Sequence, residues 1–161
     1  MWQRLSQMFA AQKLAPQCFS PVCLPEVFPM FYGAHGAVSG TTRDNFAGKP
    51  VKELRYTAYV PLALKTMNNI AKSVKAKYDL TAVSMVHRLG ICPIGEESIL
   101  IAVSAPHRQV AWKGGEEVLE ECKNKAEIWK MEEFGGEDGG VWRANRDGRP
   151  GVNIQHESNQ C

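Results

Sequence analysis

The spacing of apolar residues predicts two amphipathic helices in the middle of the chain. The first begins at Pro61 and has one apolar face, formed by Ala63, Met67, Ile70, Ala71, Val74 and Tyr78. The second follows Pro106, and its face is formed by Ala111, Gly115, Val118, Leu119, Cys122 and Ala126. Ser104 is placed to cap the second helix and Pro106 to occupy its first turn.

Other stretches have the patterns of β-strands. Apolar and polar residues alternate from Leu54 to Val60, as expected for a strand with one buried face. The stretches Ala82–Leu89 and Ser98–Val103 are more continuously apolar, which is typical of central strands. Residues 90–95 are predicted as a turn and Val141–Trp142 as a short strand. This order of elements predicts an α+β fold in which helices pack against a mixed or antiparallel sheet.

The length of 161 residues is that of a single domain. We expect the compact domain at residues 33–146 and a polar tail at 147–161. Residues 1–32 form an atypical leader, basic before Glu26 and rich in proline, in which no strand is recognisable. This composition fits an organelle transit peptide, including a mitochondrial one, and equally an unstructured leader of a cytosolic protein.

Composition narrows the classes of function. The net charge of +2 argues against a general nucleic-acid binder, and no apolar run approaches the ~20 residues that cross a bilayer. The five cysteines lack paired C-x-x-C spacing, which argues against a disulfide framework or structural zinc and favours the cytosol. Motifs for nucleotide binding, serine hydrolysis and zinc proteolysis are also missing from the sequence.

Cationic residues bracket the second predicted helix. His107 and Arg108 stand at its start, where the helix dipole favours anions, Lys123 lies at the edge of its apolar face, and Lys130 follows its end. We hypothesise that these side chains share one anionic ligand. The simpler alternative is that they are solvated side chains on the surface of a helix.

Five short motifs, in order along the chain, resemble the catalytic (large) subunit family of molybdopterin synthase. They are GTTRDNF (Gly40–Phe46), AYVPLA (Ala58–Ala63), HRLG (His87–Gly90), SAPHR (Ser104–Arg108) and IWKME (Ile128–Glu132). The resemblance implies an α/β-hammerhead-like fold and a cytoplasmic heterotetramer, in which a dimer of large subunits binds small ubiquitin-like subunits. It implies a sulfurtransferase of molybdenum cofactor biosynthesis, in which the thiocarboxylated C-terminus of the small subunit supplies sulfur to cyclic pyranopterin monophosphate. No metal or redox cofactor is implied.

The resemblance also implies roles for individual residues. Lys123 and Lys130 match the catalytic lysines. The residues that match substrate-binding positions are Thr41, Thr42, Arg43, His107, Arg108, Lys123, Lys130, Met131, Glu132 and Arg146. Guanidinium groups and a helix N-terminus suit the cyclic phosphate of this substrate.

The chain departs from the family pattern at Val38, Thr57, Gly114, Gly115 and Glu127. The two glycines alone cost roughly 2 kcal/mol in helix propensity. One alternative is therefore a non-catalytic relative that binds the Gly-Gly tail of the small subunit without turnover. A further alternative is a phosphate- or nucleic-acid-binding domain, whose binding would weaken steeply with salt.

Overall fold

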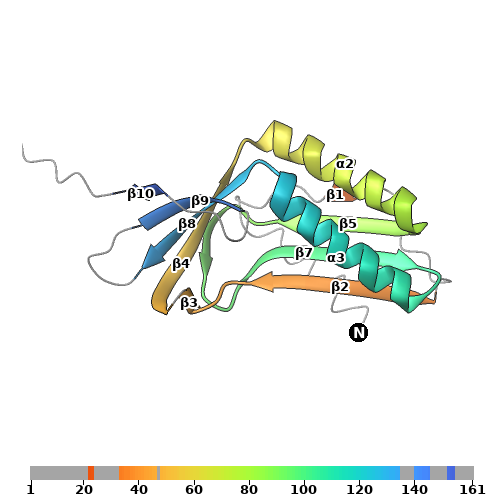
Figure 1. Ribbon diagram of the computed structural model, residues 1–161, viewed down its shortest axis with the longest axis horizontal. Helices are drawn as coiled ribbons and strands as arrows, with labels where there is room; N and C mark the ends of the chain where they lie inside the picture. The colour runs from red at the N-terminus through yellow and green to blue at the C-terminus, as the bar shows by residue number, and fades with distance from the viewer. Residues whose placement is uncertain (1–21, 24–32, 47, 135–139, 146–151, 155–161) are drawn as a thin grey trace, which may run out of the picture.

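Two sheets and two helices make up the described part of the computed structural model, which comprises residues 22–23, 33–46, 48–134, 140–145 and 152–154 (Figure 1). The first sheet has the order β1 (Val22–Cys23), β5 (Ala82–His87), β7 (Glu97–Ala105), β2 (Ala34–Thr41). The second has the order β10 (Val152–Ile154), β9 (Gly140–Ala144), β8 (Ile128–Phe134), β4 (Lys49–Ala58), β3 (Asn45–Phe46), and β6 (Gly90–Pro93) also pairs with β4. All strand pairs among these residues are antiparallel, so the predicted α+β fold is confirmed.

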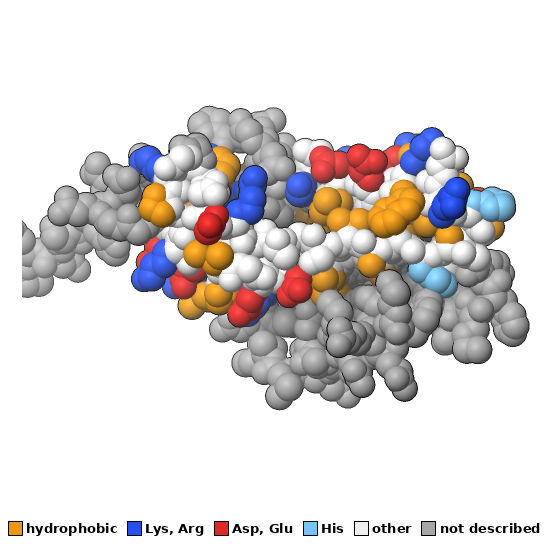
Figure 2. All heavy atoms as spheres, turned by 90° about the horizontal axis from the view of Figure 1, so that it is seen from below, with side chains coloured by type: hydrophobic (Ala, Val, Ile, Leu, Met, Phe, Trp, Pro, Cys, Tyr) orange, Lys and Arg blue, Asp and Glu red, His pale blue; other side chains and the backbone are white. Residues whose placement is uncertain are grey.

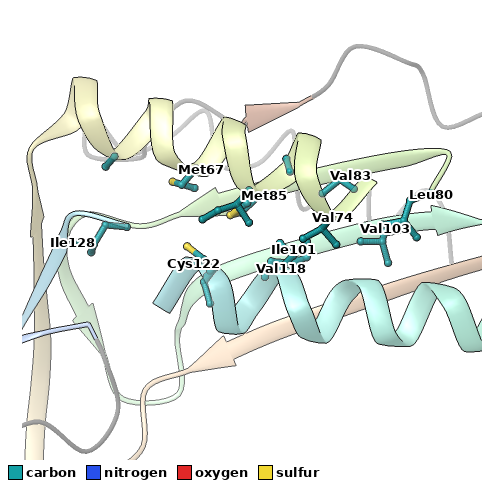
Figure 3. Packing of buried hydrophobic residues seen from close by; sticks show 14 of the residues in the cluster. Met67, Val74, Leu80, Val83, Met85, Ile101, Val103, Val118, Cys122 and Ile128 are labelled. Carbon is teal, nitrogen blue, oxygen red and sulfur yellow. The ribbon is translucent and has the colours of Figure 1, made fainter. Parts of the chain in front are cut away.

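The helices α2 (Val60–Tyr78) and α3 (Arg108–Lys125) lie side by side on one face of the first sheet (Figure 1). Their buried faces agree with the predicted stripes. The main core contains Met67 and Val74 from α2, Val118 and Cys122 from α3, and Met85, Ile101 and Val103 from the sheet (Figure 3). Each large apolar side chain buried in this way stabilises the fold by about 1.5–3 kcal/mol.

The paired glycines of α3 differ in their surroundings. A Cβ atom on Gly114 would lie 2.8 Å from Cδ1 of Leu80, a side chain that is itself buried. A Cβ atom on Gly115 would lie 3.5 Å from Cγ2 of Val38, which is an ordinary van der Waals distance. The absence of a side chain at Gly114 therefore allows close packing of α3 against Leu80, whereas Gly115 meets no such requirement.

The start of α3 differs from the prediction. Ser104 lies inside β7 with no exposed surface, and it does not cap the helix. His107 occupies the N-cap position in an extended conformation, with φ −130° and ψ 141°, and Pro106 precedes it. The predicted capping by Ser104 was wrong because the strand continues through Ala105 before the chain turns.

Several strands were not predicted. Gly90–Pro93, expected as a turn, forms β6, and Val22–Cys23, within the predicted leader, pairs with β5 as the short β1. Ile128–Phe134 forms β8, in which the buried charged residue Glu132 breaks the expected alternation. The second sheet crosses the end of the first (Figure 1). In the part of the chain that the structure describes, neither helix has the length and apolar composition needed to span a membrane.

Glu127, a predicted departure from the family pattern, joins the start of β8 to the start of α2. Its Oε1 accepts a hydrogen bond from Thr66 Oγ1 at 3.2 Å, and its carbonyl oxygen accepts one from the Tyr59 N–H at 3.3 Å. The β4–α2 junction and the α3–β8 junction are thereby held together. This contact places the end of α3 beside the second sheet.

Candidate active site

A buried cluster of charges lies on β8 and β9. Lys130 and Glu132 point to the same face of β8 because side chains alternate along a strand. Glu132 Oε1 lies 3.6 Å from Lys130 Nζ and Glu132 Oε2 lies 3.2 Å from Arg143 Nε. The latter atoms are at ion-pair distance but are not aligned as a hydrogen bond. We call these three residues the Glu132 cluster.

The Glu132 cluster is well shielded from water and carries one excess positive charge. The Glu132 side chain is 3% exposed, that of Lys130 15% and that of Arg143 21%. Buried charges are tolerated when each has an oppositely charged partner, and here the carboxylate places one oxygen toward each cation. Hydrophobic clusters lie on both sides, around Ile128 and around Phe134. Such a site favours an anionic ligand.

His87 supports the same face of the second sheet. Its ring meets that of Tyr56 edge to face, with centroids 5.0 Å apart, and Tyr56 pairs with Lys130 across β4 and β8. His87 Nδ1 lies 2.8 Å from the Arg88 carbonyl oxygen, so Nδ1–H donates there and Nε2 accepts from Asn145 Nδ2 at 3.2 Å. Burial lowers the pKa of His87 to about 4. The ring is therefore neutral at pH 7, as expected for a histidine of the core.

The loop that carries Arg43 is anchored at the end of β2. The buried Thr42 donates its hydroxyl to Cys92 Sγ at 3.2 Å, donates its N–H to the Glu96 carbonyl at 3.0 Å, and accepts the Gly95 N–H at 2.9 Å. Arg43 follows directly and is exposed. These contacts fix the backbone from which the Arg43 side chain extends.

Lys123 lies in the last turn of α3. Its side chain is 30% exposed and its Nζ lies 3.8 Å from Glu120 Oε1, an exposed carboxylate one turn earlier. The helix ends at Lys125, and β8 begins only three residues later with Ile128. Lys123 and Lys130 therefore lie at the same end of α3.

His107 and Arg108 lie at the opposite end of the first sheet from Arg43. In the pairing of β2 with β7, Ala34 faces Ala105 and Thr41 faces Glu97. His107 follows Ala105, and Arg43 follows Thr41, so the length of β2 separates them, roughly 25 Å for eight residues. The face in Figure 2 carries cationic side chains near both ends and near its middle, with a run of apolar side chains between the middle and one end. A single chain does not bring His107 and Arg108 to Arg43.

The remaining candidates have separate positions. Met131 points to the face of β8 opposite to Lys130, and Thr41 is exposed at the end of β2. Arg146 lies outside the described residues. Arg143, Tyr56 and Asn145 were missed by the sequence analysis. The only signal for Arg143 was its place beside the predicted strand Val141–Trp142.

Comparison with known proteins identifies the family to which this chain is similar. A family model described as MoaE protein matches residues 24–125. The molybdopterin synthase catalytic subunit of Sclerotinia sclerotiorum is 62% identical over 125 residues, which cover 78% of this chain and 64% of that protein. The protein of the same name from Neurospora crassa is 64% identical over 122 residues, covering 76% and 59%. The chain thus spans about three fifths of the length of these curated relatives.

Among solved structures, molybdopterin synthase from Staphylococcus aureus has a similar fold, with a TM-score of 0.67 at 36% sequence identity. The match covers 71% of this chain and 82% of that chain. The two proteins therefore share a fold over most of the length of each.

Proposed function

The chain belongs to the MoaE family, and from this premise we propose that it is the catalytic subunit of a molybdopterin synthase. In the proposed reaction, sulfur passes from the thiocarboxylated C-terminus of a small ubiquitin-like subunit to cyclic pyranopterin monophosphate. The observation that carries this proposal is the Glu132 cluster, which holds Lys130 in a shielded, net positive site. This site lies near the C-terminal end of α3, the end that also carries Lys123.

The geometry suits two anionic reactants. The cyclic phosphate and the thiocarboxylate are both negatively charged, and a site that excludes water strengthens their attraction to fixed cations. Arg43 extends from an anchored loop and can bind phosphate oxygens through its guanidinium group. We assign Arg43 to the phosphate and Lys130 to the reacting end of the tail.

Lys123 is assigned to the acyl–sulfur bond. The tail sulfur first attacks a side-chain carbon of the precursor, where a C–S bond forms as a C–O bond breaks and the oxygen leaves as water or as a freed phosphate oxygen. Water then adds to the acyl carbon, the acyl–sulfur bond breaks, and sulfur remains on the pterin as a thiol. The tail then ends in a carboxylic acid. The ammonium of Lys123 stabilises the oxyanion that forms at the acyl carbon. One partner of Lys123, Glu120, is more than half exposed, so a ligand can displace this ion pair at little cost.

A second copy of the chain completes the site in this proposal. Among the described residues β2 is an edge strand that pairs only with β7, and its sequence AHGAVSGT contains no charged residue or proline of the kinds that protect edges. If two β2 strands pair antiparallel about a twofold axis, the Thr41 end of each lies beside the Ala34 end of the other. His107 and Arg108 of the second copy then approach Arg43 of the first.

The experiment combines the purified chain with a thiocarboxylated small subunit and cyclic pyranopterin monophosphate, and measures molybdopterin. Lys123→Ala is expected to abolish the product while circular dichroism and the melting temperature stay unchanged. Lys125→Ala is the matched control, because Lys125 lies in the same turn, is 59% exposed and pairs with Glu121. Full turnover by Lys123→Ala would remove the catalytic assignment. Binding of the small subunit without any product from the unchanged chain would instead identify a non-catalytic relative.

A further inference from the structure

Arg143 lies outside all the motifs that carry the family resemblance. It stands on β9 directly opposite Lys130 on β8, so the two side chains share one face of the sheet. Its Nε lies 3.2 Å from Glu132 Oε2, and its guanidinium carbon lies 4.8 Å from the centroid of the Phe46 ring. One guanidinium group therefore contacts both β8 and β3.

These contacts join the two parts of the proposed site. Glu132 is the carboxylate that lies beside Lys130, at 3.6 Å. Phe46 is three residues after Arg43 and is partly buried against Val51, Phe134 and Val141. Through Phe46, Arg143 holds the hairpin that follows Arg43, and through Glu132 it holds the partner of Lys130.

The chemistry of arginine explains why this side chain can make both contacts. A guanidinium group is planar, so its edge can meet a carboxylate while its face stacks on an aromatic ring. A lysine ammonium at the same place has no flat face. Because Arg143 attracts one carboxylate oxygen, Glu132 stays at ion-pair distance from Lys130 rather than closing to the 2.7–3.2 Å typical of a hydrogen bond.

We propose that Arg143 is a positioning residue for sulfur transfer, which orients Lys130 through Glu132 and fixes the Arg43 hairpin through Phe46. This inference rests on the function proposed above. Arg143 acts through its neighbours and does not contact the reacting atoms. Its loss is expected to impair catalysis even though the phosphate-binding and catalytic side chains remain in the chain.

The kinetic test uses Arg143→Met and Arg143→Lys in the full chain with the thiocarboxylated small subunit. Arg143→Met is expected to lower kcat/KM by about 10-fold to 100-fold, as for displacement of a reacting group by about 1 Å. Arg143→Lys should restore only a minor part of the activity, because lysine restores the positive charge but not the planar guanidinium group. Arg55→Met is the control, because Arg55 is 48% exposed and stays on the opposite face of the same sheet.

A double-mutant cycle separates positioning from general destabilisation. If Arg143 acts through Glu132, the double variant Arg143→Met with Glu132→Gln loses little more activity than the worse single variant. Activity losses that multiply, or an Arg143→Met enzyme as active as the control, would overturn the proposal.

A second readout does not depend on the enzyme's activity. The acetylation rate of Lys130 in the isolated chain, measured by mass spectrometry, should change severalfold in Arg143→Met, while that of Lys125 stays the same. An unchanged Lys130 rate overturns the inference about Arg143. A changed rate in a chain that never forms product supports the positioning of Lys130 and refutes the proposed function instead.

Discussion

Replacing Glu132 by glutamine should markedly lower the free energy of unfolding. The substitution keeps the size of the side chain but removes the negative charge that lies between Lys130 and Arg143. Breaking a fully buried ion pair costs about 3–5 kcal/mol, and the 15% and 21% exposure of the two cations reduces the expected loss to about 2–4 kcal/mol. For a chain of this length that loss corresponds to a melting temperature lower by about 4–16 °C.

The assay is urea unfolding, which compares the unfolding free energy of Glu132→Gln with that of the control variant Glu133→Gln. Glu133 is the next residue of β8, and it pairs at 3.5 Å with Lys52, whose side chain is 67% exposed. An exposed pair of this kind contributes about 0–1 kcal/mol, so the control variant should unfold close to the unchanged chain. Equal unfolding free energies for the two variants would refute the reasoning that the Glu132 cluster is a buried ion-pair network.

Three further predictions concern stability and reactivity. Gly114→Ala should lower the unfolding free energy by about 1–2 kcal/mol despite its gain in helix propensity, because of Leu80, whereas Gly115→Ala should be neutral or stabilising. Urea unfolding measures both, and a more stable Gly114→Ala would contradict the packing argument. Burial lowers the pKa of His87 to about 4. Between about pH 6.5 and 4 the unfolded state therefore binds more protons than the folded state. The free energy of unfolding should fall by at most about 3 kcal/mol as the pH drops through that range. His87→Gln should show a flatter dependence of its unfolding free energy on pH, and an unchanged slope would assign the effect to other groups. Burial raises the pKa of the Cys122 thiol to about 12, so iodoacetamide at pH 8 should alkylate it only after unfolding, as mass spectrometry can detect; rapid alkylation of the native chain would contradict its burial.

Much of the fold follows from local patterns. The stripes of α2 and α3 and the strands β4, β5 and β7 are visible in the sequence because each buries one regular set of apolar side chains. β8 is not visible, because Glu132 occupies an inward position where an apolar residue is expected. β6 was not predicted because it begins at Gly90, a residue type that indicates a turn. In the structure Gly90 has a φ of 80°.

The candidate site was predictable only in part. The motifs that contain Arg43 and Lys130, and the place of Lys123 at the edge of a helix face, identify candidate residues. The spacing of residues along the chain does not reveal that the length of β2 separates Arg43 from His107. Arg143 was missed for a related reason. Its contact with Glu132 depends on the pairing of β8 with β9, and its contact with Phe46 joins residues almost a hundred positions apart.

The central claim is that Lys123 of one chain and His107 and Arg108 of another form one site for sulfur transfer. Co-expression of a Lys123→Ala chain with an Arg108→Ala chain tests it directly. Half of the randomly formed dimers would be mixed, each with one intact site of two, so the account predicts about a quarter of the unchanged activity from two chains that are each inactive alone. A mixture as inactive as its components would contradict the shared site.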